Sequence, residues 1–235
     1  MEPAPTTKPK GRLAHVPARM PTTLVVHEIY SSIQGESSFA GRPCTFVRLT
    51  GCNLRCTYCD TPQAFYGGVR MARAEVLAKA LSHGTPLVEL TGGEPLLQPG
   101  ALPLMTELAD AGKIVLLETS GERDVSGVDP RVHRIVDLKA PSSGEAARNR
   151  WENLPLLTRR DEVKLVLGDR ADYEWARGVV REHRLPERVG EVLFSCVFGA
   201  LDPRRLVEWI VADALPVRFQ LQLHKYVWSP TTQGV

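Results

Sequence analysis

The 235-residue sequence has little cysteine, almost no net charge and no long apolar run. No apolar stretch approaches the roughly 20 residues that cross a membrane, and none near the start has the form of a secretory leader, so no membrane role is expected. The formal net charge of +2, from 29 basic and 27 acidic residues, does not favour nucleic acid as a partner. Five cysteines form a sparse, odd set, which argues against a disulfide framework and predicts a reducing, cytoplasmic setting.

The N-terminal segment is rich in proline, lysine, arginine and threonine and shows no apolar periodicity. We therefore expect residues 1–22 to form a flexible tail and residues 23–235 to form one folded domain. The alternative for the tail is a transit peptide. Its prolines disfavour that alternative, because they prevent a good amphipathic helix.

From residue 23 onward, short apolar segments of strand character alternate with helical patterns such as 72–83 and 101–112. This alternation predicts an α/β fold in which helices cover a parallel sheet. About seven strands are expected, the last of them within 218–227, which is too few for a complete eight-stranded barrel. The sequence thus predicts one α/β domain built as a partial, open barrel.

Four segments suited to binding follow predicted strands: a loop with three cysteines, then "TGGEP", "ETSG" and "DLKAP". In parallel sheets of this kind, the chemistry lies at the carboxyl ends of the strands. These segments are therefore expected to meet at one edge of the sheet and to form the functional site there.

The cysteine loop has the spacing Cys52-x3-Cys56-x2-Cys59. A structural zinc site usually takes four protein ligands, often from two separated pairs, and no second pair is present. Three clustered thiolates also suit an iron–sulfur cluster, because each cysteine can hold one iron and leave a fourth iron open for an external ligand. Cys44 and Cys196 lie apart from the triplet and are expected to be core thiols.

The segment "CNLRCTYC" resembles the CxxxCxφC signature of radical S-adenosylmethionine enzymes, with Tyr58 as the aromatic residue. "TGGEP" resembles the glycine-rich strand end that lies along the methionine part of the cofactor in that superfamily. The resemblance implies a partial parallel β/α barrel and a [4Fe-4S] cluster on Cys52, Cys56 and Cys59. S-adenosylmethionine would chelate the open iron and, after receiving one electron, release a 5'-deoxyadenosyl radical. It also implies an electron donor such as flavodoxin or ferredoxin.

Within this superfamily, the chain resembles the 7-carboxy-7-deazaguanine synthase family from about residue 26 to its end. The resemblance rests on "SIQGE", on "CDT" at the third cysteine and on the final "LQLHKYVWSPTTQGV", whereas "DLKAP" departs from the "SPK" often found in the family. It implies that residues 23–235 are a catalytic domain that acts as a lyase in queuosine and 7-deazapurine biosynthesis. The reaction would convert 6-carboxy-5,6,7,8-tetrahydropterin to 7-carboxy-7-deazaguanine and ammonia, with magnesium as a further cofactor and a homodimer as the assembly.

The resemblance assigns roles to residues at matching positions, and each has a plainer alternative. Those implied in substrate binding are Ile33, Gln34, Gly35, Arg48 and Thr91, and those implied in cofactor binding are Tyr58, Asp60, Gly93, Ser120, Asp137 and Lys139. Thr61 would bind magnesium through its hydroxyl, although a Thr before a proline is also a common cap. Arg48 would bind a carboxylate with paired hydrogen bonds, or would form a structural ion pair. Gln34 and Ser120 could instead be ordinary turn residues.

Two other functions remain open at this stage. One is an activating enzyme that generates a glycyl radical on a partner protein. The other is a non-enzymatic zinc or iron–sulfur module. The first alternative needs a protein partner. For the second, the metal content of the anaerobically reconstituted protein decides, with about four irons and no stoichiometric zinc expected for the radical enzyme.

Overall fold

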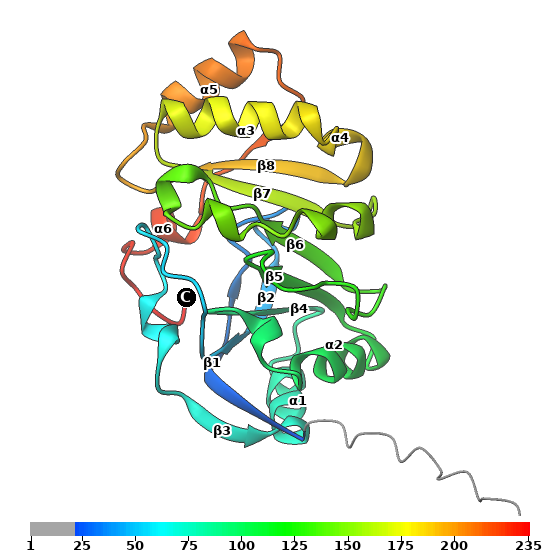
Figure 1. Cartoon of the computed structure of the whole chain (residues 1–235). Coiled ribbons are helices and arrows are strands. Elements are labelled where there is room, and N and C mark those ends of the chain that lie inside the picture. Colours follow the sequence, from blue (N-terminus) through cyan, green and yellow to red (C-terminus); the bar gives the residue numbers. More distant parts are fainter. Residues whose placement is uncertain (1–21) are drawn as a thin grey trace, which may run out of the picture.

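The computed structural model describes residues 22–235, and nine strands of this region form one continuous sheet (Figure 1). The strands are β1 (Thr23–Ile33), β2 (Pro43–Leu49), β3 (Val69–Ala72), β4 (Leu87–Gly92), β5 (Ile114–Thr119), β6 (His133–Asp137), β7 (Glu162–Leu167), β8 (Glu191–Cys196) and β9 (Arg218–Phe219). The helices are α1 (Arg73–Ser82), α2 (Ala101–Asp110), α3 (Arg170–Glu182), α4 (Leu185–Arg188), α5 (Pro203–Ala212) and α6 (His224–Val227).

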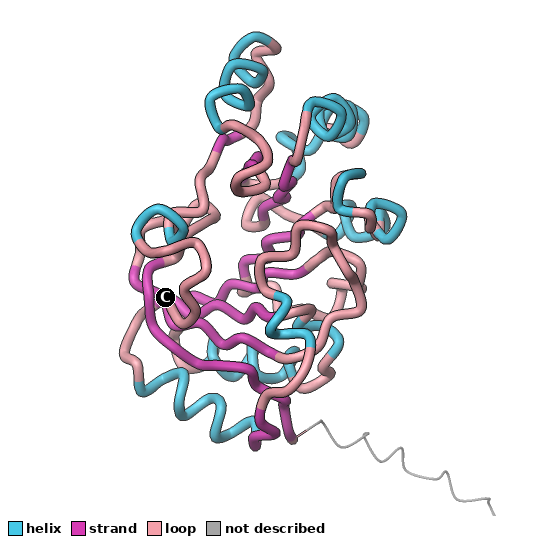
Figure 2. The backbone as a smooth tube through the Cα atoms, turned by 90° about the vertical axis from the view of Figure 1, so that its left-hand side faces the viewer, coloured by secondary structure: helices cyan, strands magenta, loops and turns pink. Residues whose placement is uncertain are grey.

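The strand order is β3-β1-β2-β4-β5-β6-β7-β8-β9, and the pairs from β2 to β9 are all parallel. Figure 2 shows these strands as a curved row with helices outside it. The row does not close, because β3 and β9 each have a neighbour on one side only. The predicted partial, open barrel is therefore confirmed.

Two strands differ from the prediction of about seven parallel ones. β1 pairs antiparallel with β2, and the short β3 adds to the outer side of β1. The connection between β1 and β2 spans only residues 34–42, which is too short for the crossover that parallel neighbours require. The described region thus has nine strands where about seven were expected, and seven of them, from β2 along the sheet to β9, form its parallel part.

The segment 218–227, predicted to be one strand, is mostly not one. Only Arg218–Phe219 pairs with β8, and after the four residues 220–223 the chain forms α6. Between them, the backbone N–H of Leu223 donates to the carbonyl oxygen of Gly35. This hydrogen bond draws the chain away from the sheet edge and toward the loop after β1.

The core lies mainly between the outer face of the sheet and the helices. Strand residues alternate between the two faces, and β4 shows the division clearly. Val88 and Leu90 belong to the large core cluster that includes helical side chains, whereas Leu87 joins a smaller cluster on the inner face. Cys44 and Cys196 are both buried in these clusters, as predicted for core thiols.

The flexible tail predicted for residues 1–22 lies outside the described residues, except for Thr22. The carbonyl of Thr22 accepts a hydrogen bond from the backbone N–H of Arg73 at the start of α1. In the part of the chain that the structure describes, no helix has the length and apolarity to span a membrane.

Candidate active site

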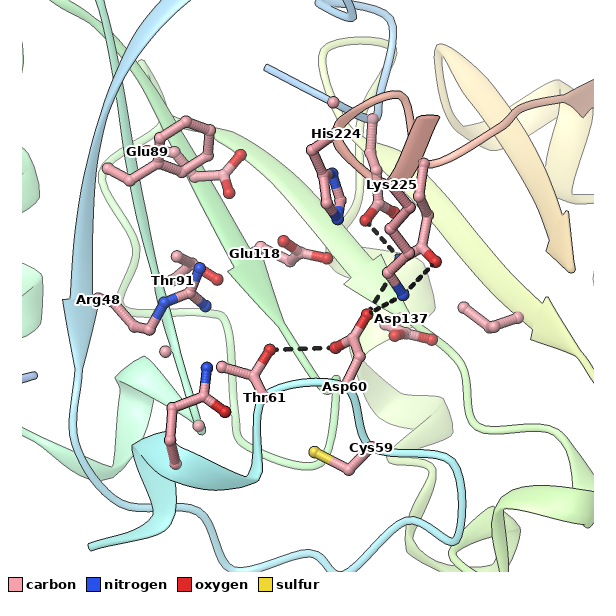
Figure 3. Close-up of a pocket in the computed structure, with 18 of the residues that line it drawn as sticks. Arg48, Cys59, Asp60, Thr61, Glu89, Thr91, Glu118, Asp137, His224 and Lys225 are labelled. Carbon is pink, nitrogen blue, oxygen red and sulfur yellow. Dashed lines mark hydrogen bonds and ion pairs between the residues drawn. The ribbon is translucent and has the colours of Figure 1, made fainter. Parts of the chain in front are cut away.

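A pocket opens at the carboxyl ends of the parallel strands, where the sequence predicts it (Figure 3). It brings together every residue to which the resemblance assigns a role. These are Ile33, Gln34, Gly35, Arg48, Cys52, Cys56, Tyr58, Cys59, Asp60, Thr61, Thr91, Gly93, Ser120, Asp137 and Lys139. Segments from β1 to β6 thus converge on one site although they are spread over more than a hundred residues.

The inner face of the sheet changes from apolar to charged toward the pocket. Every second strand residue faces inward. On this inner face, Glu89 is the next residue after Leu87 on β4, and Glu118 is the next after Leu116 on β5. On β6, Ile135 is followed by Asp137 in the same way. The apolar residues form the small inner cluster, and the charged residues line the pocket above it.

The cysteine loop is held against the end of β4 by backbone contacts. The N–H of Glu94 donates to the carbonyl of Gly51 at 2.7 Å, and the N–H of Gly93 donates to that of Leu49 at 3.2 Å. A side chain at Gly92 would clash with the Leu49 carbonyl, and one at Gly93 would clash with the Gly51 carbonyl. Gly92 also has a φ of +148°, which favours glycine. The paired glycines therefore let the two strand ends approach closely.

Glu94 clamps the ends of β4 and β5 together beneath the pocket. Its buried carboxylate accepts hydrogen bonds from the hydroxyl of Thr119, from the hydroxyl of Ser120 and from the backbone N–H of Ser120, at 2.7–2.9 Å. It also accepts the N–H of Leu96. The hydroxyl of Ser120 is therefore engaged, and the residue is more than an unassisted turn position.

The cysteine triplet fits an iron–sulfur cluster better than a single metal ion. Among the described residues, no three His, Cys, Asp or Glu side chains converge closely enough to hold one ion, as a zinc site requires. A cluster that gives each cysteine its own iron does not need that convergence. Backbone N–H groups of Leu54 and Thr61 point to the sulfurs of Cys52 and Cys59 and favour thiolates there.

Burial raises the pKa of all three thiols, that of Cys56 to about 11, while the ammonium of Lys139 opposes this shift. Without a bound group, the triplet is therefore held mainly as neutral thiols. A metal cluster would supply the positive charge that three thiolates in this setting need.

Arg48 is fixed at the pocket wall by two partners on β1. Its Nε donates to Glu28 at 2.7 Å and its Nη2 donates to the hydroxyl of Tyr30 at 3.0 Å. Figure 3 shows the guanidinium facing the pocket near Thr91. The structural ion pair weighed as an alternative thus exists, and it orients the charge toward the cavity at the same time.

Lys164 on β7 is the central cation of the charged layer. The side chain is 5% exposed, and its Nζ lies against Glu118, at 3.1 Å from Glu36 and at 3.8 Å from Asp137. Burial alone would lower the pKa of Lys164, but these carboxylates raise it well above its ordinary value. Burial would likewise raise the pKa of Glu118, but Lys164 lowers it. Lys164 and Glu118 are therefore both ionised at neutral pH.

Asp60, directly after the third cysteine, joins the cysteine loop to α6. Lys225 of α6 donates to Asp60 at 2.6 Å, and the hydroxyl of Thr61 donates to the other oxygen of Asp60 at 3.0 Å. Burial would raise the pKa of Asp60, but Lys225 lowers it well below its usual range. Thr61 occupies the N-cap position of the short 3₁₀ helix Pro62–Phe65, but its hydroxyl makes no capping hydrogen bond.

Several residues that line the same pocket have no role predicted from the sequence. They are Glu28, Tyr30, Glu36, Glu89, Glu118, Lys164, Gln222, His224, Lys225, Pro230 and 232–235. For Glu89 and Glu118 a signal existed, since each is the one charged residue of its largely apolar strand, and Lys164 follows Glu162 at an alternating position of β7. His224 reaches the site because Gly35 has no side chain, and one there would clash with the imidazole.

Comparison with known proteins agrees with this site. A model of the radical SAM superfamily matches residues 46–181. The 7-carboxy-7-deazaguanine synthase of Chlorobaculum tepidum is 49% identical over 90% of this chain and 97% of the relative. That of Koribacter versatilis is 48% identical over 89% and 99%.

A crystal structure of QueE from Escherichia coli has the same fold, with a TM-score of 0.70 at 23% identity, and the match covers 84% of this chain and 94% of that one. Enzymes of the radical SAM superfamily use a [4Fe-4S] cluster and S-adenosylmethionine, which the cysteine triplet of the pocket suits. The chain therefore belongs to the 7-carboxy-7-deazaguanine synthase family of the radical S-adenosylmethionine superfamily.

Proposed function

We propose that the protein converts 6-carboxy-5,6,7,8-tetrahydropterin to 7-carboxy-7-deazaguanine with loss of ammonia, as a step of 7-deazapurine and queuosine biosynthesis. The observation that carries this proposal is a single pocket lined both by the cysteine triplet and by a fixed guanidinium, that of Arg48. The triplet suits a radical-generating cluster, and the guanidinium suits a small carboxylated substrate.

In this proposal, Cys52, Cys56 and Cys59 hold the [4Fe-4S] cluster, and S-adenosylmethionine binds beside it. When bound, the cluster and S-adenosylmethionine would supply the radical chemistry that begins the reaction at C6 of the pterin. The residues assigned to S-adenosylmethionine line the pocket: Tyr58, Asp60, Gly93, Ser120, Asp137 and Lys139. Among them, Lys139 and Asp137 form a buried ion pair at 2.8 Å, and one oxygen of Asp137 carries no hydrogen bond within residues 22–235. That oxygen is available to a polar group of the cofactor.

The substrate would occupy the space between the loop after β1 and the end of β4. Ile33, Gln34 and Gly35 border it on one side, and Thr91 borders it on the other. Gln34 is 3% exposed and its amide oxygen accepts the N–H of Glu36, so it is no solvated turn residue. These groups exclude water from the heterocycle and orient it, and Arg48 pairs with its carboxylate.

Turnover without any partner protein tests this function against the glycyl-radical activase. The purified protein is reconstituted anaerobically with iron and sulfide, then given S-adenosylmethionine, magnesium, a chemical reductant and the pterin. We expect 7-carboxy-7-deazaguanine and ammonia in equal amounts. Formation of 5'-deoxyadenosine without either product would show that the pterin is not the substrate.

Replacement of Arg48 by alanine is expected to weaken binding of the carboxylated pterin roughly ten- to a hundredfold. Loss of one charge-assisted contact costs about 1.5–3 kcal/mol, which corresponds to that range. Arg48→Lys should recover only part of the affinity, because an ammonium cannot make the paired bonds of a guanidinium. The measurement is equilibrium binding of the acid and of its uncharged amide. Equal weakening for both ligands would mean that Arg48 supports the fold and does not bind the carboxylate.

Replacement of Thr61 by alanine is expected to abolish the stimulation of turnover by magnesium. The reason is that magnesium prefers oxygen ligands, keeps several waters and can be held by one protein hydroxyl. The cluster spectrum and S-adenosylmethionine binding should be unchanged. Thr57→Ala is the matched control, because its hydroxyl donates to the Ser142 carbonyl and serves no metal. A Thr61→Ala variant that responds to magnesium as the wild type does would contradict the assignment.

An electron donor of the flavodoxin or ferredoxin type, a homodimeric assembly and a cytoplasmic location stay predictions from the sequence and the resemblance. The division into a tail of residues 1–22 and a catalytic domain of residues 23–235 is likewise a prediction from the sequence.

A further inference from the structure

Glu89 is a buried carboxyl group in the pocket wall to which neither the motifs nor the proposed mechanism assigns a role. It lies on β4 two residues before Thr91, so both side chains face the inner side of the sheet. Glu89 is 2% exposed, and Figure 3 shows its carboxyl group directed into the cavity. Leu116 on the neighbouring β5 lies opposite in register and belongs to the apolar layer beneath.

One oxygen of Glu89 is engaged and the other is not. The Nε2 of Gln34 donates to Oε2 of Glu89. Turning the Gln34 amide over would break a hydrogen bond, because Oε1 of Gln34 accepts the backbone N–H of Glu36 at 3.0 Å. Within residues 22–235, no hydrogen bond reaches Oε1 of Glu89. The structure thus presents one carboxyl oxygen, at the pocket surface, without a partner.

The charges that face Glu89 compensate it only in part, because Lys164 lowers its pKa less than burial and Glu118 raise it. Glu118 on β5 and Glu36 in the loop after β1 are both acidic, and the cation of this layer, Lys164 on β7, pairs with both of them. Burial, followed by the charge of Glu118, raises the pKa of Glu89 well above its ordinary value. A buried carboxyl without a cation or a full set of hydrogen bonds is costly to maintain. Such groups cluster at binding sites, where a ligand completes them.

We propose that Glu89 recognises the adjacent 2-amino and N3–H groups of the pterin ring and is the residue that selects a 2-amino heterocycle. This inference rests on the proposed function and adds a specificity determinant to it. Two neighbouring N–H donors match the acceptor sites of one carboxylate, because each of its oxygens can accept two hydrogen bonds. Oε1 of Glu89 is open to the ligand, and Oε2, which accepts one bond from Gln34, keeps a second lone pair.

The placement of Glu89 relative to Arg48 fits one flat ligand between them. Arg48 on β2 lies opposite Thr91 on β4, and Glu89 is two residues earlier on that strand. Strand geometry then sets the two Cα atoms about 8 Å apart, on the same face of the sheet. Arg48 would bind the carboxylate at one end of the pterin, and Glu89 would bind the amino edge at the other.

The test compares two stable ligands, 6-carboxypterin and 6-carboxylumazine, which carries an oxygen in place of the 2-amino group. Both are titrated anaerobically into the cluster-loaded protein with S-adenosylmethionine present. The wild type should bind the pterin more tightly. In Glu89→Gln, affinity for the pterin should fall about 10- to 100-fold, because an amide offers one acceptor and one donor where the ring has two donors. Affinity for the lumazine should be kept or rise, because its N3–H and 2-oxo group match the acceptor and the donor of the amide, so the preference should disappear or reverse.

Glu162→Gln is the matched control. Glu162 is also a buried strand glutamate whose pKa is raised by burial, but it bonds to Ser38 and does not line the pocket. This variant should keep the wild-type preference, which separates ligand reading from the general effect of neutralising a buried carboxyl.

Several outcomes would overturn the inference. Glu89→Gln with an unchanged preference would show that Glu89 does not read the amino edge. Equal binding of both ligands by the wild type would also overturn the inference. This result needs no variant, so it holds even if Glu89→Gln fails to fold. Binding of neither ligand by the wild type would overturn the proposed function together with the inference.

Discussion

Replacement of any one of Cys52, Cys56 or Cys59 by alanine is expected to abolish formation of 7-carboxy-7-deazaguanine. Each thiolate would hold one iron, so the loss of one ligand leaves a cluster that is incomplete or not assembled. The loop supplies no substitute, because among the described residues no other cysteine lines the pocket. Iron content, the absorbance of the reconstituted protein and 5'-deoxyadenosine formation are the measurements, with about four irons per chain expected in the wild type.

Cys44→Ala and Cys196→Ala are the controls for the triplet. Both side chains are buried in the two core clusters and neither lines the main pocket. These variants should keep the wild-type iron content and turnover, with a modest loss of stability from the deleted sulfur. Loss of iron in either control, with the triplet intact, would mean that the wrong cysteines had been chosen as ligands.

The second large effect is expected in stability. Lys164→Met should lower the free energy of unfolding by about 3–5 kcal/mol near pH 7, because it removes the partner of buried carboxylates and leaves their charge uncompensated. Denaturant unfolding measures this loss. Lys79→Met is the control, since its ion pair with Glu75 on α1 is exposed and should contribute no more than about 0.5 kcal/mol.

The stability difference between wild type and Lys164→Met should depend on pH. The folded pKa of Glu118 is depressed by Lys164, so its contribution is present above the unfolded value of about 4.3 and is lost as the pH falls below it. The folded pKa of Lys164 is raised, so its contribution is full below about pH 10. The difference between wild type and Lys164→Met should therefore be largest between about pH 5 and 10 and should shrink toward pH 3. A difference that does not depend on pH would point to lost packing instead.

The sequence predicted the sheet and the edge of the site because both follow from short-range patterns. Apolar strands alternating with helices specify a parallel sheet, and glycine-rich segments after strands mark its carboxyl edge. The charged strand residues Glu89, Glu118 and Lys164 were readable in the same pattern. The pattern does not tell which face of each strand lies inside the curved sheet, because packing between segments distant in sequence decides that.

Other features could not be predicted from local patterns. The antiparallel direction of β1 depends on the length of one loop, and α6 depends on a hydrogen bond between Leu223 and Gly35, far apart in sequence. The partners of Arg48 likewise come from another strand. In each case, the deciding contact joins residues that no short motif contains.

The C-terminal residues that line the pocket have a consequence for how the enzyme becomes active during synthesis. The cysteine loop and the glycine pair are synthesised well over a hundred residues before Pro230 and residues 232–235, which complete the pocket wall. Lys225 and Asp60 join these two stages, since the late helix docks on the early loop. A nascent chain can thus fold its sheet while its site is still open on one side. An affinity tag fused after Val235 would start at the pocket itself, whereas one placed before Thr22 would start beside α1.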